Sequence, residues 1–338
     1  MNQTEGKYNR FALVKEMMQT PGIIRSYDTG VSAKFVKGVS GKSGLFLTGE
    51  GSSRIFPAKR AIYSLLKGGF AKPVLTEGAT QALEYDLRDY SVFAASNSGQ
   101  TKEVIRLISQ LRKQGHKSVF GITANVNTRL QELVTEIHIL SCGKEEAVAA
   151  TKSVIEQGLF YDSLFRQLKG EEMGGLSALA DMTEKALTTR IPEEYINLIK
   201  NAAVIHFAGR NNGVAEELAL KTNEITRKKS TYLEGTFAVH GIEEVMDKSE
   251  VLIWVDPFAE EETKFHECLV KGVGMNVFTI TSGSSLFPSI KIPDGGEYRE
   301  YVQLAAGWNL LVEVGLALGI NLDKPVRARK VGNEYIEE

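Results

Sequence analysis

Cysteine is nearly absent from this sequence, which contains only Cys142 and Cys268 among its 338 residues. Two isolated cysteines cannot build the disulfide framework of a small secreted protein, and they lack the spacing of a metal site. Long apolar runs are missing as well. The polar N-terminus lacks the features of a signal peptide, and no run reaches the length of about 20 apolar residues that crosses a bilayer. We therefore expect a cytoplasmic protein that acts without a membrane.

A surplus of charge is also missing. The 40 basic and 42 acidic residues give a formal net charge of -2. Proteins that bind nucleic acid or an anionic membrane surface carry a basic footprint, so neither partner is expected here. The composition is otherwise that of a soluble globular protein, 43% hydrophobic and 24% charged, with enough residues for one large or two medium domains.

The sequence contains an internal repeat of a strand, a polar loop and a helix. In the first half an apolar run at 44–47 leads through glycines and serines into a helical pattern at 55–66. In the second half a run at 204–207 leads through Gly209 and Gly213 into a helical pattern that ends near Thr226. The loop glycines Gly49 and Gly209 are 160 residues apart. A second strand–helix–strand pattern, at 91–123, recurs at 251–281 with nearly the same offset.

Short apolar strands that alternate with amphipathic helices predict parallel sheets covered on both faces. The predicted fold class is therefore α/β, with two tandem doubly wound parallel-sheet domains. The expected parts are a leading helical segment at 1–40, a first domain at 41–170, a connector at 171–192, a second domain at 193–325 and a tail at 326–338. The leading segment contains a helix at 11–18 that ends before Pro21, and the connector contains a helix at 176–188. The tail is charged and too polar for a core.

A loop rich in hydroxyl groups, residues 96–101, lies between an apolar strand at 91–95 and a helical pattern at 103–111. The N-terminus of a helix presents unpaired N–H groups and the positive end of the helix dipole, which both favour an anion. Ser96, Ser98 and Thr101 add hydroxyl donors, and Gly99 lets a ligand approach the backbone. The loop predicts a site for a phosphorylated small molecule, most of all a sugar phosphate. Single residues of this kind also serve as ordinary helix caps.

The corresponding loop of the second half has different chemistry. Residues 256–260, Asp-Pro-Phe-Ala-Glu, include acids and no serine, so we expect one phosphate site per chain. Residues 49–54 lack the third glycine of a dinucleotide fingerprint, and no Gly-Lys-Ser/Thr loop opens a helix after a strand. We expect no cofactor and no metal.

Three segments carry a resemblance to a known family: residues 49–53, residues 96–101, and the stretch Glu145-Glu146-Ala147-Val148-Ala149-Ala150-Thr151-Lys152. Together they resemble the tandem sugar isomerase (SIS) domain proteins. Members include phosphosugar isomerases, stand-alone glucosamine-6-phosphate deaminases and the isomerase half of glucosamine-6-phosphate synthase. The resemblance runs from about Met17 to the C-terminus.

The resemblance implies two sets of ligand-binding residues. The phosphate would be bound by Ser53, Ser96, Asn97, Ser98 and Thr101, where Asn97 stands at a position that is Gln in the synthase. The sugar would be contacted by Gly51, Ser52, the main chain of Val148, and Thr151.

The resemblance also implies catalytic residues in the second half. Lys221 and Glu224 match a helix whose Glu moves the substrate proton. His240 matches a histidine that assists ring opening and reaches in from the neighbouring subunit, so a homodimer is implied. Lys330 matches a tail lysine that forms a Schiff base. The synthase pattern has Glu at the position of Phe237, and Glu234 is a candidate to replace it.

These residue types suit proton transfer between C1 and C2 of an open-chain sugar. The transfer needs one carboxylate that takes and returns a proton, and the i, i+3 spacing sets Glu224 beside Lys221. Ring opening needs a group that titrates near neutrality, such as His240. Lys330 would act as an imine-forming nucleophile or simply as a cation. We expect structural roles for the other histidines, His116, His138, His206 and His266.

Several functions stay open. The sequence begins within the SIS region, without a glutaminase segment, so deamination or aldose–ketose isomerisation is expected rather than amination. The first hypothesis is conversion of glucosamine 6-phosphate to fructose 6-phosphate and ammonia. A tagatose-6-phosphate-type isomerase and a fructosamine-6-phosphate deglycase are alternatives of the same class. The alternative of another class is a phosphosugar sensor without catalysis.

Overall fold

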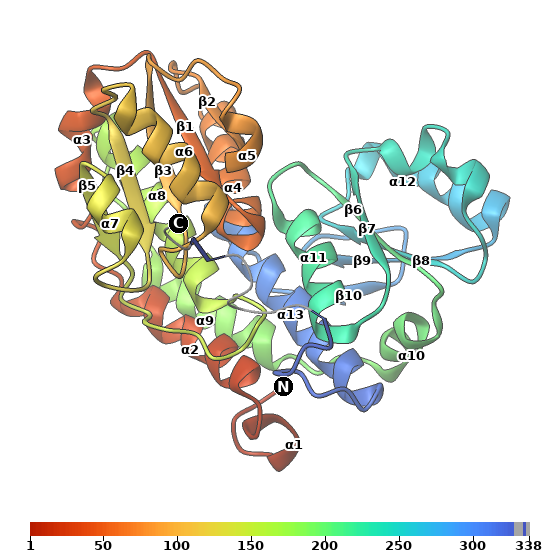
Figure 1. Ribbon diagram of the computed structural model, residues 1–338. Helices are drawn as coiled ribbons and strands as arrows, with labels where there is room; N and C mark the ends of the chain where they lie inside the picture. Colours follow the sequence, from red (N-terminus) through yellow and green to blue (C-terminus); the bar gives the residue numbers. More distant parts are fainter. Residues whose placement is uncertain (328–333, 336–338) are drawn as a thin grey trace. The chain divides into compact units, whose positions relative to one another are not determined.

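The computed structural model describes residues 1–327 and 334–335 of the protein (Figure 1). Within them lie two five-stranded parallel sheets, with strand orders β2-β1-β3-β4-β5 and β10-β9-β8-β6-β7. Counted along the chain, both orders read 2-1-3-4-5, so the internal repeat of the sequence is a repeat of topology. The predicted fold class of two parallel-sheet domains is confirmed.

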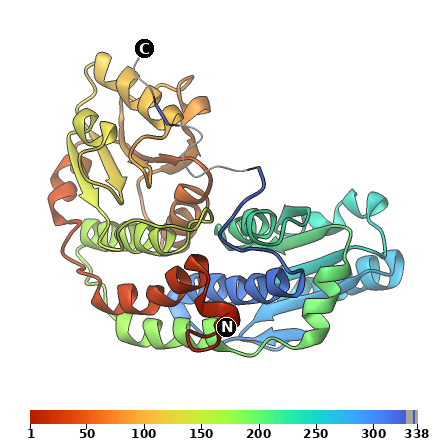
Figure 2. The same cartoon turned by 60° about the horizontal axis from the view of Figure 1, so that its bottom comes forward.

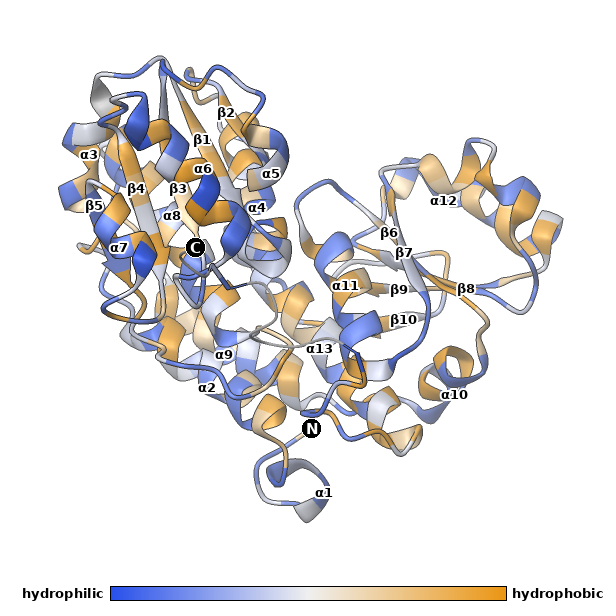
Figure 3. Cartoon of the chain, viewed as in Figure 1, coloured by the Kyte–Doolittle hydropathy of each residue, from blue (hydrophilic) through white to orange (hydrophobic). Residues whose placement is uncertain are grey.

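The strands are short; the three inner strands of each sheet are almost entirely buried, and the edge strands are partly exposed. The first sheet contains β1 (Gly44–Gly49), β2 (Val74–Gly78), β3 (Tyr90–Ala95), β4 (Val119–Thr123) and β5 (Glu136–Ile139). The second contains β6 (Ile205–Gly209), β7 (Ser230–Glu234), β8 (Val251–Val255), β9 (Asn276–Thr281) and β10 (Ser289–Lys291). Central strands buried on both faces need continuous apolar residues, which explains the runs that the sequence displays. Figure 3 shows these strands as hydrophobic and the helices with one hydrophilic side.

The chain folds into two compact units, which are not continuous in sequence. The first-sheet unit contains Ile23–Glu145 and Ala150–Leu176, together with Glu334 and Tyr335. The second-sheet unit contains Met1–Gly22, Glu146–Ala149 and residues 177–327. The domain boundaries expected from the sequence stay a prediction.

Helices cover both faces of the first sheet because side chains alternate along each strand. Leu45, Leu47 and Phe93 point to one face, against α3 (Ala33–Ser40), α4 (Ile55–Lys67) and α8 (Lys152–Lys169). Phe46 and Val92 point to the other face. There they meet α5 (Ala79–Ala82), α6 (Lys102–Lys113) and α7 (Arg129–Leu133).

The second sheet is covered in the same way. Trp254 and Leu252 of β8 pack on one face against α12 (Glu262–Phe265) and the π-helix His266–Val273. The helical part of the pattern at 251–281 is therefore only partly α-helical. On the other face α11 (Val214–Thr226) packs against α13 (Arg299–Ala317), where Gly307 meets Leu218 with no room for a Cβ. Figures 1 and 2 show α11 and α13 side by side.

The remaining helices of the second-sheet unit include α9 (Leu176–Thr188), whose predicted bounds are confirmed, and α10 (Glu193–Asn201). Among the helices that the structure describes, none combines the length and hydropathy of a membrane span.

The leading helix, α2 (Ala12–Ser26), continues through Pro21, so its predicted end before that proline is wrong. Proline has no N–H and leaves the carbonyl four residues earlier without its helical donor. That carbonyl belongs to Met17, and it accepts a hydrogen bond from the hydroxyl of Thr20 at 2.7 Å. The neighbouring threonine thus replaces the missing donor. The short helix α1 (Gly6–Asn9) precedes α2.

Residues 334 and 335 of the C-terminal tail pack on the first-sheet unit. Glu334 pairs with Thr101 in an antiparallel bridge, and the Tyr335 N–H donates to the Gln100 carbonyl at 2.8 Å. The Tyr335 ring joins the apolar cluster beneath α6. Tyr335 is partly buried there, so it packs against the core without being part of it.

Candidate functional site

The hydroxyl-rich loop, residues 96–101, connects the carboxyl end of β3 to the start of α6. The neighbouring strand β1 ends in a 3-10 turn over Gly51–Ser53. Because β2 lies on one side of β1 and β3 on the other, the chain reverses its winding direction between β1 and β3. Ligands of doubly wound sheets bind at this switch point, outside the carboxyl ends of the strands. The residues expected to bind phosphate thus lie where the topology favours a ligand.

Hydrogen bonds within the loop fix its shape. The Ser96 and Thr101 hydroxyls are 2.7 Å apart, and the Gln100 N–H donates to the Ser98 hydroxyl at 3.1 Å. The Asn97 carbonyl accepts from the Ala124 N–H at 3.1 Å and from the Asn125 side chain at 2.8 Å. Ser96 is only 1% exposed, whereas Ser98 and Thr101 are partly exposed. Ser96 therefore supports the loop from inside, and its neighbours present the outer hydroxyls.

Glycine is required at position 99 for two reasons. Its φ is +68°, in the left-handed region that favours glycine, and a Cβ there would lie 2.5 Å from the Thr128 side chain. Thr128 caps α7 by accepting from the Gln131 N–H. The loop thus packs closely against the N-terminus of α7, at the same edge of the sheet.

A buried carboxylate joins this loop to the start of α8. Glu145 is 1% exposed and accepts a hydrogen bond from the Asn97 side-chain amide at 2.8 Å. It also accepts from the Thr151 N–H at 2.8 Å and from the Ser153 hydroxyl at 2.7 Å. Charge-assisted bonds of this kind are stronger than neutral ones, so Glu145 fixes Asn97 relative to Thr151. Glu145 belongs to the segment 145–152 that carries the family resemblance, but the sequence gave no sign of this role.

Thr151 and Val148 lie on the segment that the resemblance assigns to the sugar. Thr151 is fully buried, and its hydroxyl lies 3.5 Å from Glu145. Val148 is partly exposed. The residues before Val148 are held by Glu16 of α2, which accepts from the N–H groups of Glu146 and Ala147. Contact of Thr151 or Val148 with a sugar stays a prediction.

In the second-sheet unit, Lys221 and Glu224 touch on helix α11. The Lys221 ammonium is 2.6 Å from the Glu224 carboxylate and 3.2 Å from that of Glu217. Lys221 and Glu217 are fully buried, and Glu224 keeps 24% of its side chain exposed. Burial lowers the pKa of Lys221, but the two carboxylates outweigh burial and hold its pKa above the ordinary value of 10.5. Lys221 is therefore a fixed cation.

Glu217 was missed by the sequence reasoning, although its i, i+4 spacing to Lys221 was readable. Of the three charged groups only Glu224 is open to solvent. A carboxylate that is partly exposed and held by a buried cation is suited to accept a proton from a ligand and return it.

His240 follows the 3-10 turn Phe237–Val239 and is exposed, with its Nε2 3.4 Å from the Lys264 ammonium. Phe237 is 50% exposed, and Glu234 is exposed at the carboxyl end of β7. The His240 backbone N–H caps this turn by donating to the Phe237 carbonyl at 3.2 Å, while its side chain faces the surface. Its function across a subunit interface stays a prediction. Lys330 lies outside the described residues.

The switch point of the second sheet holds an internal ion pair. Arg210 follows β6, Asp256 follows β8, and their charged groups are 2.8 Å apart. Arg299 lies 3.5 Å from the same carboxylate, and the Arg210 guanidinium covers the Phe258 ring at 4.2 Å. At this switch point the carboxylate of Asp256 already pairs with the arginines. The corresponding loop of the first half has serines and no acid of its own, which leaves room for the negative charge of a ligand.

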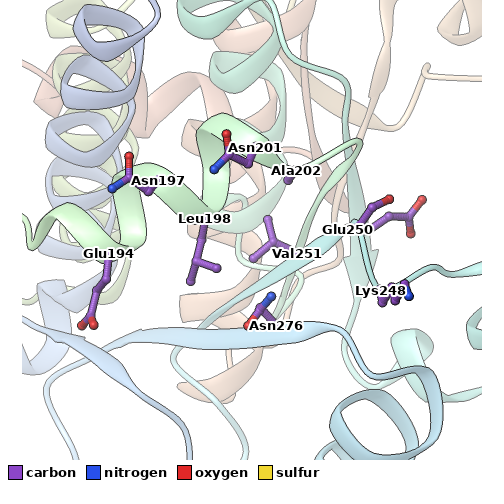
Figure 4. A pocket seen from close by; sticks show the side chains of 10 residues that line it. Glu194, Asn197, Leu198, Asn201, Ala202, Lys248, Glu250, Val251 and Asn276 are labelled. Atoms are coloured by element: carbon purple, nitrogen blue, oxygen red, sulfur yellow. The ribbon is translucent and has the colours of Figure 1, made fainter.

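A pocket of about 460 Å³ lies at the opposite edge of the second sheet (Figure 4). Val251 and Asn276, which begin β8 and β9, line it with Asn197 and Asn201 of α10. These are amino ends of strands, and none of the predicted site residues that the structure describes lines this pocket. It is therefore separate from the candidate site.

Comparison with known proteins agrees with the resemblance carried by the motifs. The model of the family described as SIS domain matches residues 42–166, which include residues 51–53 and 96–101. The second half has the same strand order as the matched segment, but the family model matches only the first half. The expected tandem pair is thus confirmed as topology and not as a second SIS match.

The chain is 24% identical over 318 residues to a glutamine–fructose-6-phosphate aminotransferase (isomerizing) of Pyrobaculum aerophilum. The match covers 87% of this chain and 52% of that protein, so the chain spans about half the length of this curated relative. Among solved structures, the C-terminal domain of glucosamine-fructose-6-phosphate aminotransferase from Francisella tularensis superposes with a TM-score of 0.79 and 17% identity, covering 95% of this chain and 100% of that domain.

Tagatose-6-phosphate ketose/aldose isomerase from Escherichia coli has a TM-score of 0.78 and 18% identity, covering 95% of this chain and 98% of that one. At such low identity these similarities establish the fold alone. The chain thus has the same fold as these solved structures.

Proposed function

We propose that the protein is an enzyme that moves a proton between C1 and C2 of a hexose 6-phosphate. The observation that carries the proposal is the Lys221–Glu224 pair, with its ammonium–carboxylate distance of 2.6 Å and only Glu224 partly exposed. A protein that merely sensed a sugar phosphate would need the hydroxyl-rich loop and would not need a partly exposed carboxylate fixed at this place.

In this proposal the loop and the turn before it bind the phosphate through Ser53, Ser96, Asn97, Ser98 and Thr101. The pre-formed hydrogen bonds of residues 96–101 support this assignment, because a fixed loop spends little binding energy on ordering. The sugar hydroxyls meet Gly51, Ser52, Thr151 and the main chain of Val148.

Glu224 is the proposed base. In the open-chain form of glucosamine 6-phosphate it takes the proton from C2 and returns it to C1, which gives the imine of fructose 6-phosphate. Water then adds to the imine and ammonia leaves, so one water is consumed and fructose 6-phosphate is formed. Lys221 holds the Glu224 carboxylate in place. Without the amino group, the same proton transfer converts an aldose into a ketose.

His240 and Lys330 complete the proposal. His240 of a second copy assists ring opening, which makes the homodimer the working form. Lys330 acts as the imine-forming amine or as a cation near the sugar.

The test is to incubate the protein with glucosamine 6-phosphate and measure fructose 6-phosphate and ammonia. Tagatose 6-phosphate and fructosamine 6-phosphate are offered in parallel, because they distinguish the isomerase and deglycase alternatives. Glu224→Gln should lower turnover by about 100-fold or more while the affinity for the sugar phosphate is kept. Glu216→Gln, on the same helix, is the matched control and should keep turnover. Raised melting temperatures with these sugars but no turnover would identify a sensor and refute the enzyme.

A further inference from the structure

Arg227 directly follows helix α11 and has an unusual backbone. Its φ is +58°, in the left-handed region, where the Cβ of any residue other than glycine crowds the following carbonyl. Glycine or asparagine is the usual residue at this place after a helix. The contacts of the Arg227 side chain explain why an arginine occupies this position.

The Arg227 guanidinium binds four backbone carbonyls. It donates to the carbonyls of Glu224 and Ile225, the latter at 2.9 Å. It also donates to the carbonyls of Asn321 at 3.0 Å and Lys324 at 2.6 Å. The last four carbonyls of a helix have no partner within the helix, and a cation there is favoured by the helix dipole. Arg227 thus caps α11 and joins it to residues 321–324.

Residues 321–324 are themselves held in place by hydrogen bonds. The Asn321 side chain accepts from the N–H groups of Asp323 at 3.0 Å and Lys324 at 3.2 Å. The Asp323 carboxylate in turn accepts from the N–H groups of Ala12 and Leu13 at 2.9 Å each, at the start of α2. The end of α11 is therefore fastened through Arg227 to a segment that is itself fixed.

Glu224 is held from two directions. Lys221 binds its carboxylate at 2.6 Å, and Arg227 binds its carbonyl. We infer that Arg227 is a positioning residue for the reaction: it fixes the main chain of Glu224 against residues 321–324 so that the carboxylate keeps its place. This inference rests on the proposed function, in which Glu224 is the base.

Arg227→Gly is the informative variant because it removes the guanidinium and suits the left-handed backbone, so the fold is retained. Lys228→Ala is the matched control, since it removes the next basic side chain, which donates to the Lys200 carbonyl at 2.8 Å. We expect Arg227→Gly to lower kcat by about 10-fold or more with little change in KM, because small displacements of a catalytic group are costly. The affinity for fructose 6-phosphate should stay as in the wild type, and Lys228→Ala should keep the wild-type kcat.

Hydrogen–deuterium exchange of peptides that cover 221–229 and 319–327 gives a readout that does not depend on activity. Faster exchange in both peptides of Arg227→Gly, with exchange in the rest of the chain unchanged, supports the role of Arg227 in joining α11 to residues 321–324. Wild-type kcat in Arg227→Gly, or unchanged exchange in these peptides, would overturn the inference. A wild-type protein that turns over no sugar phosphate would refute the proposed function instead, and the exchange measurement would still decide whether Arg227 fastens the helix.

Discussion

The Glu145 carboxylate and the Asn97 amide are 2.8 Å apart, although 48 residues separate them in the sequence. Glu145 also holds the N–H of Thr151, so one buried side chain links the loop after β3 to the first turn of α8. The phosphate and sugar contacts proposed for these two segments therefore depend on Glu145, which is itself assigned no contact with the phosphate or the sugar. Such a link makes the affinity for the ligand sensitive to a change behind the loop.

Glu145→Gln should weaken the binding of fructose 6-phosphate and lower the stability of the protein. The substitution keeps the shape of the side chain but removes the charge, and a hydrogen bond to a charged group contributes about 1.5–3 kcal/mol. We expect a loss of affinity of about 10-fold in isothermal titration calorimetry. The control is Glu146→Gln, at the exposed neighbouring position, which should bind as the wild type does. Equal affinities in the two variants would contradict the role of Glu145.

Lys221→Met should destabilise the protein by about 3–5 kcal/mol at neutral pH, because it leaves the fully buried Glu217 carboxylate without this counter-ion. The folded-state pKa of Lys221 lies above its ordinary value of 10.5. The stabilisation by its charge is therefore fully present below pH 10.5 and is lost only as the pH rises through the higher folded-state pKa.

Urea unfolding of wild type and Lys221→Met over a series of pH values measures this difference. The gap in the free energy of unfolding should be constant up to pH 10.5 and should narrow above it. Lys229→Met removes an exposed lysine and should show a small gap at every pH. A gap for Lys221→Met that closes already near neutrality would refute the buried ion pair.

Acid should destabilise the protein through His138. This ring is buried and stacks on Phe160 with 4.7 Å between ring centroids. Burial lowers the pKa of His138 from 6.5 to about 4. Because the unfolded chain binds the proton more readily, stability is lost as the pH falls from 6.5 towards 4, by up to about 3 kcal/mol.

His138→Phe keeps an aromatic ring on Phe160 and removes the titrating group. Its free energy of unfolding should fall less steeply than that of the wild type between pH 6.5 and 4. His266→Gln, which changes a partly exposed histidine, should leave the slope unchanged. Identical slopes for wild type and His138→Phe would show that another group causes the acid sensitivity.

Mixed subunits test whether His240 acts on the Glu224 of a second copy. Glu224→Gln and His240→Asn are each expected to be inactive as homodimers. Co-expressed in equal amounts, they form mixed dimers with one intact site, so about a quarter of the wild-type turnover should return. Size-exclusion chromatography with light scattering establishes the dimer independently. No recovery in a sample that contains mixed dimers would mean that His240 serves its own chain or has no catalytic role.

Much of the fold and part of the site could be predicted from the sequence because they depend on local order. The apolar runs marked the central strands, and the hydroxyls of residues 96–101 marked a loop between a strand and a helix. The i, i+3 spacing of Lys221 and Glu224 set them side by side as soon as the helix was assumed, since helix geometry fixes such neighbours.

The misses have a different physical origin. Pro21 continues its helix because a nearby threonine replaces a lost donor, which a rule about proline alone does not contain. Tyr335 leaves a charged tail to pack on an apolar cluster formed by residues more than 200 positions earlier in the chain. Glu145, Arg227 and Asp256 acquire their roles from carbonyls, amides and guanidinium groups on other elements.

The sequence by itself determined the two repeated parallel sheets, the loop that suits a phosphate and the helix that pairs a lysine with a glutamate. These features follow from periodicity, helix ends and fixed spacing, which act within a few residues. Only the tertiary structure decided that Lys221 is fully buried between two carboxylates, that Glu145 holds the loop, and that Arg227 fastens the end of α11. Burial and long-range hydrogen bonds are properties of the packed chain, because they depend on which distant residues exclude water from a group.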